Sequence, residues 1–303
     1  MTELTRLVGQ VVAVHDLDAA VVDFERIGFV FCDRSSRPDW GIDTAMVAFP
    51  DGSYFELVAS IDRTKEIGAT VGGFLDKRGE GLYLAVVEVP DVAAAHSELV
   101  SAGVGVVGPP VPAPEARGIA CDLLWLKPRS TGGAFVQLLA YRGGRHYEEQ
   151  QTSWARGLFN LAIAVADLDQ AVESFERIGL RVSDRSSRED WGLTTATFHL
   201  REASSIELVS ASDASRPAGA AVAKFLAAHG GGHYMTVIEV PDVDAVFARL
   251  VSAGVETLGP PTLSPPESPW PLAKQLWVRP SSSHGAFVEF LSFVPTQSDD
   301  VAR

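Results

Sequence analysis

The pattern of apolar and polar positions predicts a unit of one strand, one helix and three further strands. Apolar residues at helical spacing from Leu17 to Ile27 indicate the helix, which we expect to begin after Asp16 and to end at Gly28. A polar loop precedes the third strand, and a tight turn precedes the fourth. The strands of this first unit are predicted at residues 10–14, 29–32, 44–49 and 54–59.

The same order of elements returns after residues 62–80, a segment that we expect to connect the two units. A helix is predicted over residues 92–102 because Gly103 follows its last apolar position. The short strand after it is expected to end at Gly108-Pro109-Pro110. The strands of the second unit are predicted at residues 84–89, 104–107, 122–126 and 134–141.

The second half of the chain repeats the first half. Residues 33–41 return as 184–192 with one change, Pro38 to Glu189. Each copy has about 140 residues, a usual size for one hydrophobic core. We therefore predict an α+β fold with two tandem domains built from four βαβββ modules, with eight strands and two main helices per domain. The predicted boundaries are 1–142 for the first domain, with modules at about 7–60 and 81–141, 143–156 for a linker, 157–294 for the second domain, with modules at about 157–211 and 231–294, and 295–303 for a tail.

Composition narrows the class of partner. Apolar residues make up 46% of the chain and charged residues 21%, which is typical of a globular protein. The formal charge of −14 argues against a nucleic acid or an anionic membrane as partner, because both need a basic surface. The N-terminus lacks a secretory signal, and two cysteines cannot build a disulfide framework. We expect a cytoplasmic protein with a small-molecule substrate or ligand, either a monomer or a homodimer.

Several short sequences carry a resemblance to a known superfamily. The sequence 14–18 after an apolar strand, the helix end 24–28 and the closing strand 54–57 resemble those of the vicinal oxygen chelate superfamily, also called the glyoxalase/bleomycin-resistance/dioxygenase superfamily. The sequences 125–133 and 277–285 are similar to the final hairpin of methylmalonyl-CoA epimerases. The resemblance implies glyoxalase-like domains in which paired modules cup their mixed sheets around one pocket per pair.

The resemblance also implies where metal ligands would be expected. Members of the superfamily place a ligand, usually His, at the start of each module's first strand, and a carboxylate or Gln on its last strand. The first-strand positions of this chain are Gly9, Leu84, Asn160 and Met235. The last-strand positions are Glu56, Gln137, Glu207 and Glu289. Without His there are too few ligands for a catalytic metal, so we expect no cofactor, and a weakly bound Mg²⁺, Mn²⁺ or Fe²⁺ would use Glu207 and Glu289.

Glu207 and Glu289 are the candidate catalytic residues. Strand alternation directs both into the cup, because their apolar neighbours take the helix-packing face. Two carboxyl groups in an apolar cup cannot both ionise easily, so one should hold its proton near neutral pH. By the resemblance, Glu289 matches a catalytic glutamate of methylmalonyl-CoA epimerases and Glu207 a metal-ligand position. The alternative is that both are structural and bonded to neighbouring strands or water.

A repeated polar loop supplies candidate substrate-binding residues. Trp40 and Trp191 could stack on a planar ligand, while Arg37 and Arg188 bind its carboxylate or phosphate. In the alternative interpretation, each loop is a rigid turn in which Trp covers the core and Arg pairs with Asp33 or Asp184. The remaining candidates for the pocket lining are Asn160, His233, Glu56 and Gln137.

His233 has two interpretations. It lies two residues before Met235, so on a strand both side chains would point into the cup, where His233 could act as a base or ligand. Because three glycines precede it, a histidine in a surface loop is the favoured interpretation.

Three functions compete on these grounds. The first is an isomerase, epimerase or lyase that acts on a small oxygenated substrate by carboxylate acid–base chemistry. The second is a metal-free binding or sequestration protein of the bleomycin-resistance type. The missing histidines and the acidic surface support this function. The third is a ring-cleaving or hydroxyphenylpyruvate-type dioxygenase, which is disfavoured. Such enzymes use two His and one Glu as metal ligands, and only the Glu, Glu289, is present in this chain.

Overall fold

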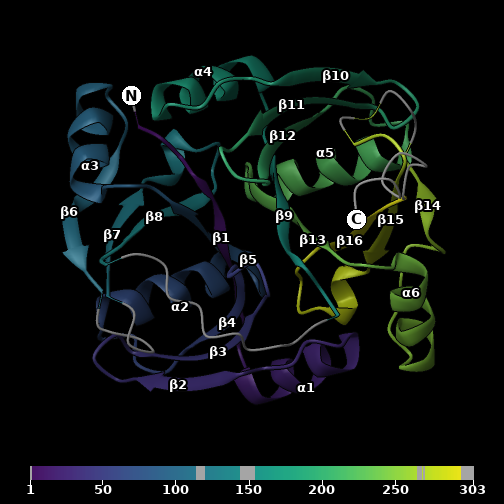
Figure 1. The fold of residues 1–303 in the computed structure, drawn as a ribbon, viewed down its shortest axis with the longest axis horizontal. Coiled ribbons are helices and arrows are strands. Elements are labelled where there is room, and N and C mark those ends of the chain that lie inside the picture. The colour runs from purple at the N-terminus through teal and green to yellow at the C-terminus, as the bar shows by residue number, and fades with distance from the viewer. Residues whose placement is uncertain (1, 114–119, 144–153, 265–267, 269, 295–303) are drawn as a thin grey trace, which may run out of the picture.

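The computed structural model describes residues 2–113, 120–143, 154–264, 268 and 270–294. In this part of the chain, the strands form two mixed sheets of eight strands each, one from each half of the sequence (Figure 1). The predicted α+β fold with two tandem domains of eight strands each is therefore confirmed. Most of the predicted linker and the whole predicted tail lie outside the described residues.

The first sheet contains both modules of the first domain. Its strands are β1 (Arg6–Ala13), β2 (Asp33–Arg37), β3 (Ile42–Ala48), β4 (Tyr54–Ser60), β5 (Gly81–Glu88), β6 (Val106–Pro112), β7 (Cys121–Leu126) and β8 (Phe135–Tyr141). The strand order is β2-β3-β4-β1-β5-β8-β7-β6. The modules therefore meet where β1 and β5 pair antiparallel.

The second sheet repeats this topology with the order β10-β11-β12-β9-β13-β16-β15-β14. Its strands are β9 (Gly157–Ala164), β10 (Asp184–Arg188), β11 (Leu193–His199), β12 (Ser205–Ala211), β13 (Gly232–Glu239), β14 (Thr262–Leu263), β15 (Ala273–Val278) and β16 (Val288–Phe293). We call the inner faces of the two curled sheets the first cup and the second cup.

Four helices follow the sequence prediction, and their ends explain why. Asp16 caps the first of them, since its carboxylate accepts a hydrogen bond from the Ala19 N–H, and Gly28 ends it in the left-handed conformation at φ 115°. Aspartates cap the other three in the same way. The four helices are α1 (Leu17–Ile27), α3 (Val92–Ser101), α4 (Leu168–Ile178) and α6 (Val243–Ser252).

The connecting segment of each domain contains a third helix, so the prediction of two main helices per domain was wrong. These helices are α2 (Glu66–Arg78) and α5 (Pro217–His229). Neither has a side-chain cap, and glycines interrupt their apolar spacing, which is why the sequence gave no clear signal. They matter for function because Val222 of α5 packs on Leu193 and Val209, so α5 closes one end of the second cup.

Two strand predictions were also wrong. Residues 29–32 are not a strand, and the predicted polar loop after them forms β2, an edge strand with alternately exposed side chains. The strand expected to end at Gly108 continues through Pro112. This strand lies at the edge of the sheet, and its pairing with β7 has a register shift between Val107 and Val111. At an edge, the missing N–H groups of its prolines cost no hydrogen bond to a neighbouring strand.

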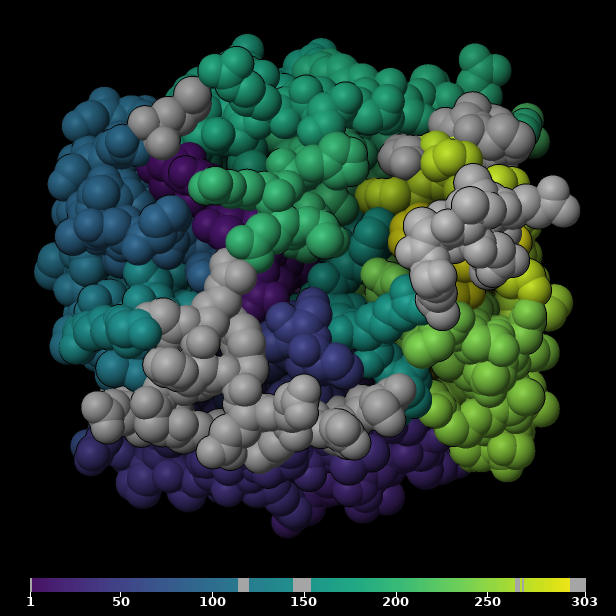
Figure 2. Space-filling view, viewed as in Figure 1, coloured from purple at the N-terminus to yellow at the C-terminus, as the bar shows by residue number. Residues whose placement is uncertain are grey.

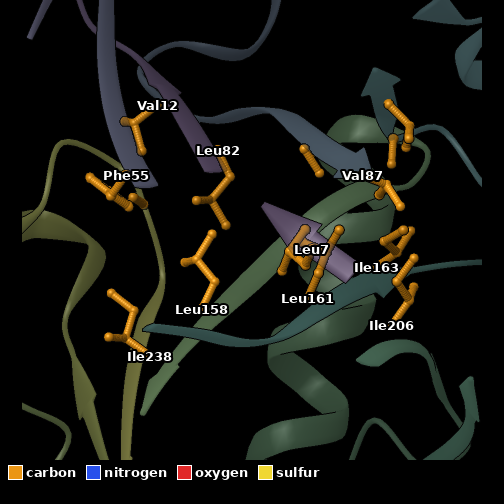
Figure 3. Packing of buried hydrophobic residues seen from close by; sticks show 14 of the residues in the cluster. Leu7, Val12, Phe55, Leu82, Val87, Leu158, Leu161, Ile163, Ile206 and Ile238 are labelled. Carbon is orange, nitrogen blue, oxygen red and sulfur yellow. The ribbon is translucent and has the colours of Figure 1, made fainter. Parts of the chain in front are cut away.

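The apolar core is shared by the two domains. Leu7 and Leu82 of the first domain pack against Leu158 and Leu161 of the second (Figure 3). The contact is symmetric: the Leu7 N–H donates to Ser204 Oγ at 2.9 Å, and at the matching positions of the repeat the Leu158 N–H donates to Ser53 Oγ at 2.9 Å. The two copies thus meet as the subunits of a symmetric dimer would.

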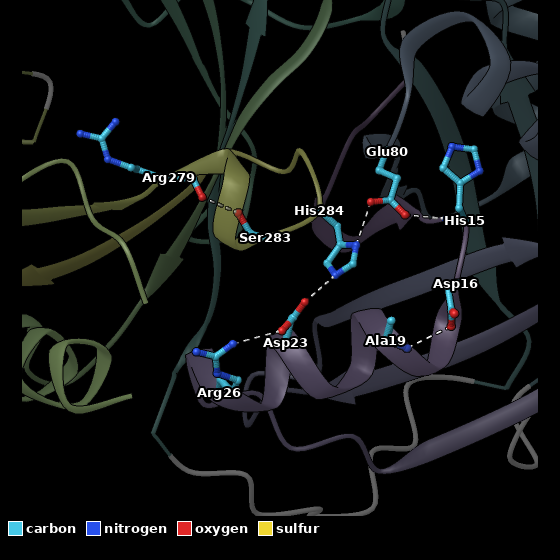
Figure 4. A network of polar contacts seen from close by, with 9 residues as sticks. All are labelled: His15, Asp16, Ala19, Asp23, Arg26, Glu80, Arg279, Ser283 and His284. Carbon is cyan, nitrogen blue, oxygen red and sulfur yellow. Dashed lines mark hydrogen bonds and ion pairs between the residues drawn. The ribbon is translucent and has the colours of Figure 1, made fainter. Parts of the chain in front are cut away.

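Polar contacts at the rim of this interface also join the domains. His284 follows the short 3₁₀ helix η2 (Pro280–Ser282), which matches η1 (Pro128–Ser130) of the first domain. The Nδ1 atom of His284 lies 2.8 Å from Glu80 Oε2 (Figure 4). Its Nε2 lies 3.2 Å from Asp23 Oδ2. The space-filling view shows the N-terminal segment against the second domain (Figure 2), where the Glu202 N–H donates to the Thr5 carbonyl at 2.9 Å. Within the described residues, no helix has the length and apolarity to cross a membrane.

Candidate active site in the second cup

The strand register places Glu207, Asn160 and Glu289 on the inner face of the second sheet. Glu207 of β12 stands opposite Ala162 of β9, and Asn160 lies two residues before Ala162 on that strand. Asn160 in turn stands opposite Val237 of β13, which pairs with Glu289 of β16. Opposite residues and alternate residues share a face, so the three polar side chains lie on one floor.

The two glutamates stand on opposite sides of this floor. Strands β9 and β13 separate β12 from β16, so three interstrand steps lie between Glu207 and Glu289. At about 4.8 Å per step, this is roughly 14 Å along the sheet. The curl of the sheet turns the two side chains toward each other, and the charge of Glu207 raises the pKa of Glu289. A small substrate between the glutamates would have one carboxyl group on each side.

Glu289 is almost completely buried and holds two hydrogen bonds. Gln275 Nε2 donates to its Oε1 at 2.7 Å, and Trp277 Nε1 donates to its Oε2 at 3.1 Å. The side chain is only 2% exposed, and burial raises its pKa from 4.5 to about 8, although the two hydrogen bonds act in the opposite direction. Glu289 is therefore mainly a neutral carboxylic acid at pH 7.

Glu207 has a different electrostatic environment. Burial raises its pKa as well, but the positive charge of Arg188 is the largest opposing influence, followed by the Thr195 hydroxyl. For Glu289, Arg188 is the weakest of the influences. The pKa values of both carboxyl groups are therefore raised by burial, and at Glu207 the charge of Arg188 favours the ionised form.

Arg188 is a positive group that acts on both glutamates of the second cup. It ends β10, its Nη2 donates to Ser268 Oγ at 3.1 Å, and its guanidinium carbon lies 4.8 Å from the ring centroid of Trp191. Trp191 meets Trp277 edge to face with 6.5 Å between ring centroids. Among the described residues, Arg188 forms no ion pair, so the predicted pairing with Asp184 is not found.

Asn160 and Thr197 each have a buried polar atom on the floor with no partner in the described part of the chain. The side chain of Asn160 accepts a hydrogen bond at Oδ1 from Ser205 Oγ at 2.9 Å, while its Nδ2 is unpaired. Thr197 Oγ1, opposite Glu207, is also unpaired. Both residues have 0% exposure. Buried polar groups are normally satisfied, so these two have hydrogen-bonding capacity to spare for a ligand.

The donor set of the second cup does not fit a divalent metal ion. Both oxygens of Glu289 accept hydrogen bonds from N–H groups, and the carboxyl group favours its protonated form. The Asn160 carbonyl is bound by Ser205, and Met235 offers only a thioether. No three His, Cys, Asp or Glu side chains gather into a metal site within the described residues. A catalytic metal needs about three such ligands.

The floor of the first cup is covered at Gly9 by the side chain of Tyr54. Tyr54 lies over Gly9, where an added Cβ atom would come within 2.4 Å of the Tyr54 ring. The matching residues in the second cup are Ser205 and Asn160. Burial, followed by the nearby Glu56 charge, raises the pKa of Tyr54 well above its ordinary value, so the phenol stays neutral.

The four candidates of the first cup lie around this tyrosine. Glu56 is half-buried on β4 and Gln137 is buried on β8. The Arg37 guanidinium carbon lies 5.1 Å from the centroid of the Trp40 ring, which packs on the apolar clusters beside Tyr54. The structure thus brings the predicted residues together, but around a side chain rather than an open pocket.

The favoured interpretation of His233 as a surface-loop residue was wrong. It lies on β13, is 6% exposed, and places Nε2 2.8 Å from the Phe135 carbonyl of the first domain. Burial lowers its pKa to about 4, so the ring is neutral. A register shift between His233 and Met235 separates it from the cup floor, so it does not join the glutamates.

Sequence reasoning missed the residues that hold Glu289, Asn160 and Arg188 in place. Gln275 and Trp277 lie on β15, whose register puts them beside Glu289. Trp277 repeats Trp125, which was a usable signal, whereas Gln275 replaces Leu123. Ser205 and Ser268 gave no signal, because their roles depend on contacts with Asn160 and Arg188 from other strands.

Comparisons with known proteins agree with this architecture. A family model described as "Glyoxalase-like domain" matches residues 10–157, and one described as "Glyoxalase/Bleomycin resistance protein/Dioxygenase superfamily" matches residues 160–264. An ethylmalonyl-CoA/methylmalonyl-CoA epimerase from Cereibacter sphaeroides is 30% identical over 129 residues, which cover 42% of this chain and 91% of the relative.

A solved structure shows the same fold over nearly the whole chain. A mutant of 4-hydroxymandelate synthase from Streptomyces coelicolor superimposes with a TM-score of 0.72 at 15% identity, covering 99% of this chain and 96% of the other. Methylmalonyl-CoA epimerase from Mycobacterium tuberculosis matches with a TM-score of 0.43 at 26% identity, covering 50% of this chain and 97% of the other.

Proposed function

This chain belongs to the vicinal oxygen chelate (glyoxalase/bleomycin resistance/dioxygenase) superfamily, and we propose that its second cup is the active site of an isomerase or epimerase that works by carboxylate acid–base chemistry. One observation carries the proposal. Two buried carboxyl groups lie on one floor, burial raises the pKa of both, and the charge of Arg188 is the largest opposing influence at Glu207 but the weakest influence at Glu289. We therefore assign the carboxylate to Glu207 and the acid to Glu289. This is the starting state that a two-base proton exchange requires.

The reaction follows from this arrangement. Glu207 removes a proton from a carbon next to a carbonyl group, and the electrons of the broken C–H bond form an enolate with its negative charge on the carbonyl oxygen. Glu289 then delivers its proton to the opposite face of the same carbon, which inverts the configuration. Glu207 is now the acid and Glu289 the carboxylate, so the enzyme is ready for the reverse direction. Loss of a leaving group from the same enolate would make the protein a lyase instead.

Arg188 supports a substrate that carries a carboxylate. Its guanidinium group has a planar face on Trp191 and one hydrogen bond to Ser268, and it forms no ion pair within the described residues. Such a group binds carboxylates with two parallel hydrogen bonds. The relative from C. sphaeroides is named for ethylmalonyl-CoA and methylmalonyl-CoA. We therefore propose a 2-substituted malonyl thioester, or a related carbonyl acid, as the substrate class.

The test is exchange of the α-hydrogen with solvent. Methylmalonyl-CoA and a panel of carbonyl acids are incubated with the protein in D₂O, and deuterium is measured by mass spectrometry. We expect deuterium in at least one compound with the wild type and with E56Q, a first-cup control, and a loss of at least about 100-fold when both glutamates are replaced, in E207Q/E289Q. A compound that binds tightly and is recovered without deuterium would instead support the sequestration function.

A further inference from the structure

The second cup has a hydrogen-bond donor in the middle of its floor. Asn160 lies on the central strand β9, between Ser205 on one side and Val237 on the other. Ser205 Oγ donates to Asn160 Oδ1 at 2.9 Å, which fixes the orientation of the amide. The NH₂ group is therefore free to donate, is fully buried, and has no partner among the described residues.

The position of this donor relative to the glutamates is defined by the strand register. Along the row through Asn160, Val237 comes next and Glu289 follows. In the adjacent row, Glu207 stands opposite Ala162, a small residue beside Asn160 on the same strand. The amide thus lies between the two carboxyl groups. When a substrate carbon lies between the glutamates, its neighbouring carbonyl oxygen can lie over the Asn160 amide.

We propose that Asn160 Nδ2 donates a hydrogen bond to the substrate carbonyl oxygen, and that Ser205 is the residue that positions it. This inference rests on the proposed function. As Glu207 removes the proton, negative charge develops on that oxygen, and a donor already oriented toward it stabilises the enolate without reorganising. Asn160 thus supplies the hydrogen bond that stabilises the enolate, in a cup whose side chains do not fit a metal ion.

The first cup shows what the floor is like without the donor. Its matching residues are Gly9 and Tyr54, and the tyrosine ring fills the space above the glycine. The two substitutions belong together, since an Asn side chain at position 9 would collide with that ring. The second cup has Asn160 and Ser205 at these positions, so of the two cups it is the one that carries the amide.

The test compares two forms of one probe. The nitronate of 3-nitropropionate carries a carboxylate and a delocalised negative charge on its nitro oxygens, whereas its carbon-protonated form has the same size and the same carboxylate. Calorimetry gives the affinity of each form for the wild type, N160A and S205A. The control is T44A, which truncates a buried polar side chain on β3 of the first domain. We expect the wild type and T44A to prefer the nitronate by about 10-fold to 100-fold, from the strength of a hydrogen bond to a charged group.

We expect N160A to lose this preference and S205A to lose part of it, while both keep their affinity for the carbon-protonated form. A wild type that does not prefer the nitronate, or an N160A variant that keeps the preference, would overturn the inference. If N160A fails to fold by circular dichroism, S205A decides. Failure of the proposed function would appear separately, as nitronate binding that depends on Asn160 without α-hydrogen exchange.

Discussion

Replacing Glu289 with Gln should reverse its effect on stability between low and high pH. The pKa of the folded-state carboxyl group is about 8, against an ordinary 4.5. Between these values the folded protein binds more protons than the unfolded chain, so the free energy of unfolding falls as the pH rises. This contribution is complete below pH 4.5 and lost above pH 8. At about 1.4 kcal/mol per pKa unit, it amounts to at most about 5 kcal/mol.

The E289Q variant lacks this pH dependence but loses a hydrogen bond. Glutamine has one acceptor oxygen, whereas Gln275 and Trp277 each donate to Glu289. One N–H group is therefore left without an acceptor, at a cost of about 1 to 3 kcal/mol. We expect E289Q to be less stable than the wild type at pH 5 and more stable at pH 9.

The assay is urea unfolding at pH 5, 7 and 9, followed by circular dichroism and tryptophan fluorescence. The two probes are compared because a two-domain chain does not always unfold in one step. E66Q, on the exposed surface of α2, should follow the wild type at every pH. A difference between wild type and E289Q that stays constant from pH 5 to pH 9 would refute the assignment of a buried neutral acid.

Three further predictions follow from the same contacts. Tyr54→Ser should remove the side chain that covers the floor of the first cup and lower the free energy of unfolding by about 3 to 5 kcal/mol in urea titrations. The rate of α-hydrogen exchange should not change. A variant as stable as the wild type would contradict this account of the packing. Arg188→Gln should weaken binding of a carboxylate probe about 10-fold to 100-fold by calorimetry and move the lower limb of the exchange pH profile upward, because Arg188 lowers the pKa of Glu207. An unmoved limb would speak against that coupling. His233→Leu introduces the residue that the first copy has at this position, Leu82. It should lower the free energy of unfolding by about 1 to 3 kcal/mol and leave α-hydrogen exchange intact. A loss of exchange at full stability would show that the histidine acts in the site.

The repeat and the alternation of strands predicted the fold and the shared face of the glutamates. Phe55 and Leu57 are fully buried in the core, while Glu56 between them points into the first cup, as the period of two requires. The same rule holds for Glu207. These features depend on local sequence alone, because a strand with one face in the core fixes the direction of every side chain.

The rest depends on contacts between distant segments. Tyr54 fills the first cup only because a glycine stands opposite it on another strand. His233 leaves the floor of the second cup through a register shift that has no sequence signature. Helix α5 closes the cup although its apolar spacing is weak, since packing against the sheet stabilises it more than its own propensity does.

The measurement that tests the central claim most directly is α-hydrogen exchange of each enantiomer of the substrate, followed separately in E207Q and E289Q. If one glutamate serves each face of the carbon, both variants lose inversion, and each retains exchange with only one enantiomer, opposite in the two variants. Inversion that persists in either variant, or the loss of the same enantiomer in both, would contradict a two-base site in the second cup.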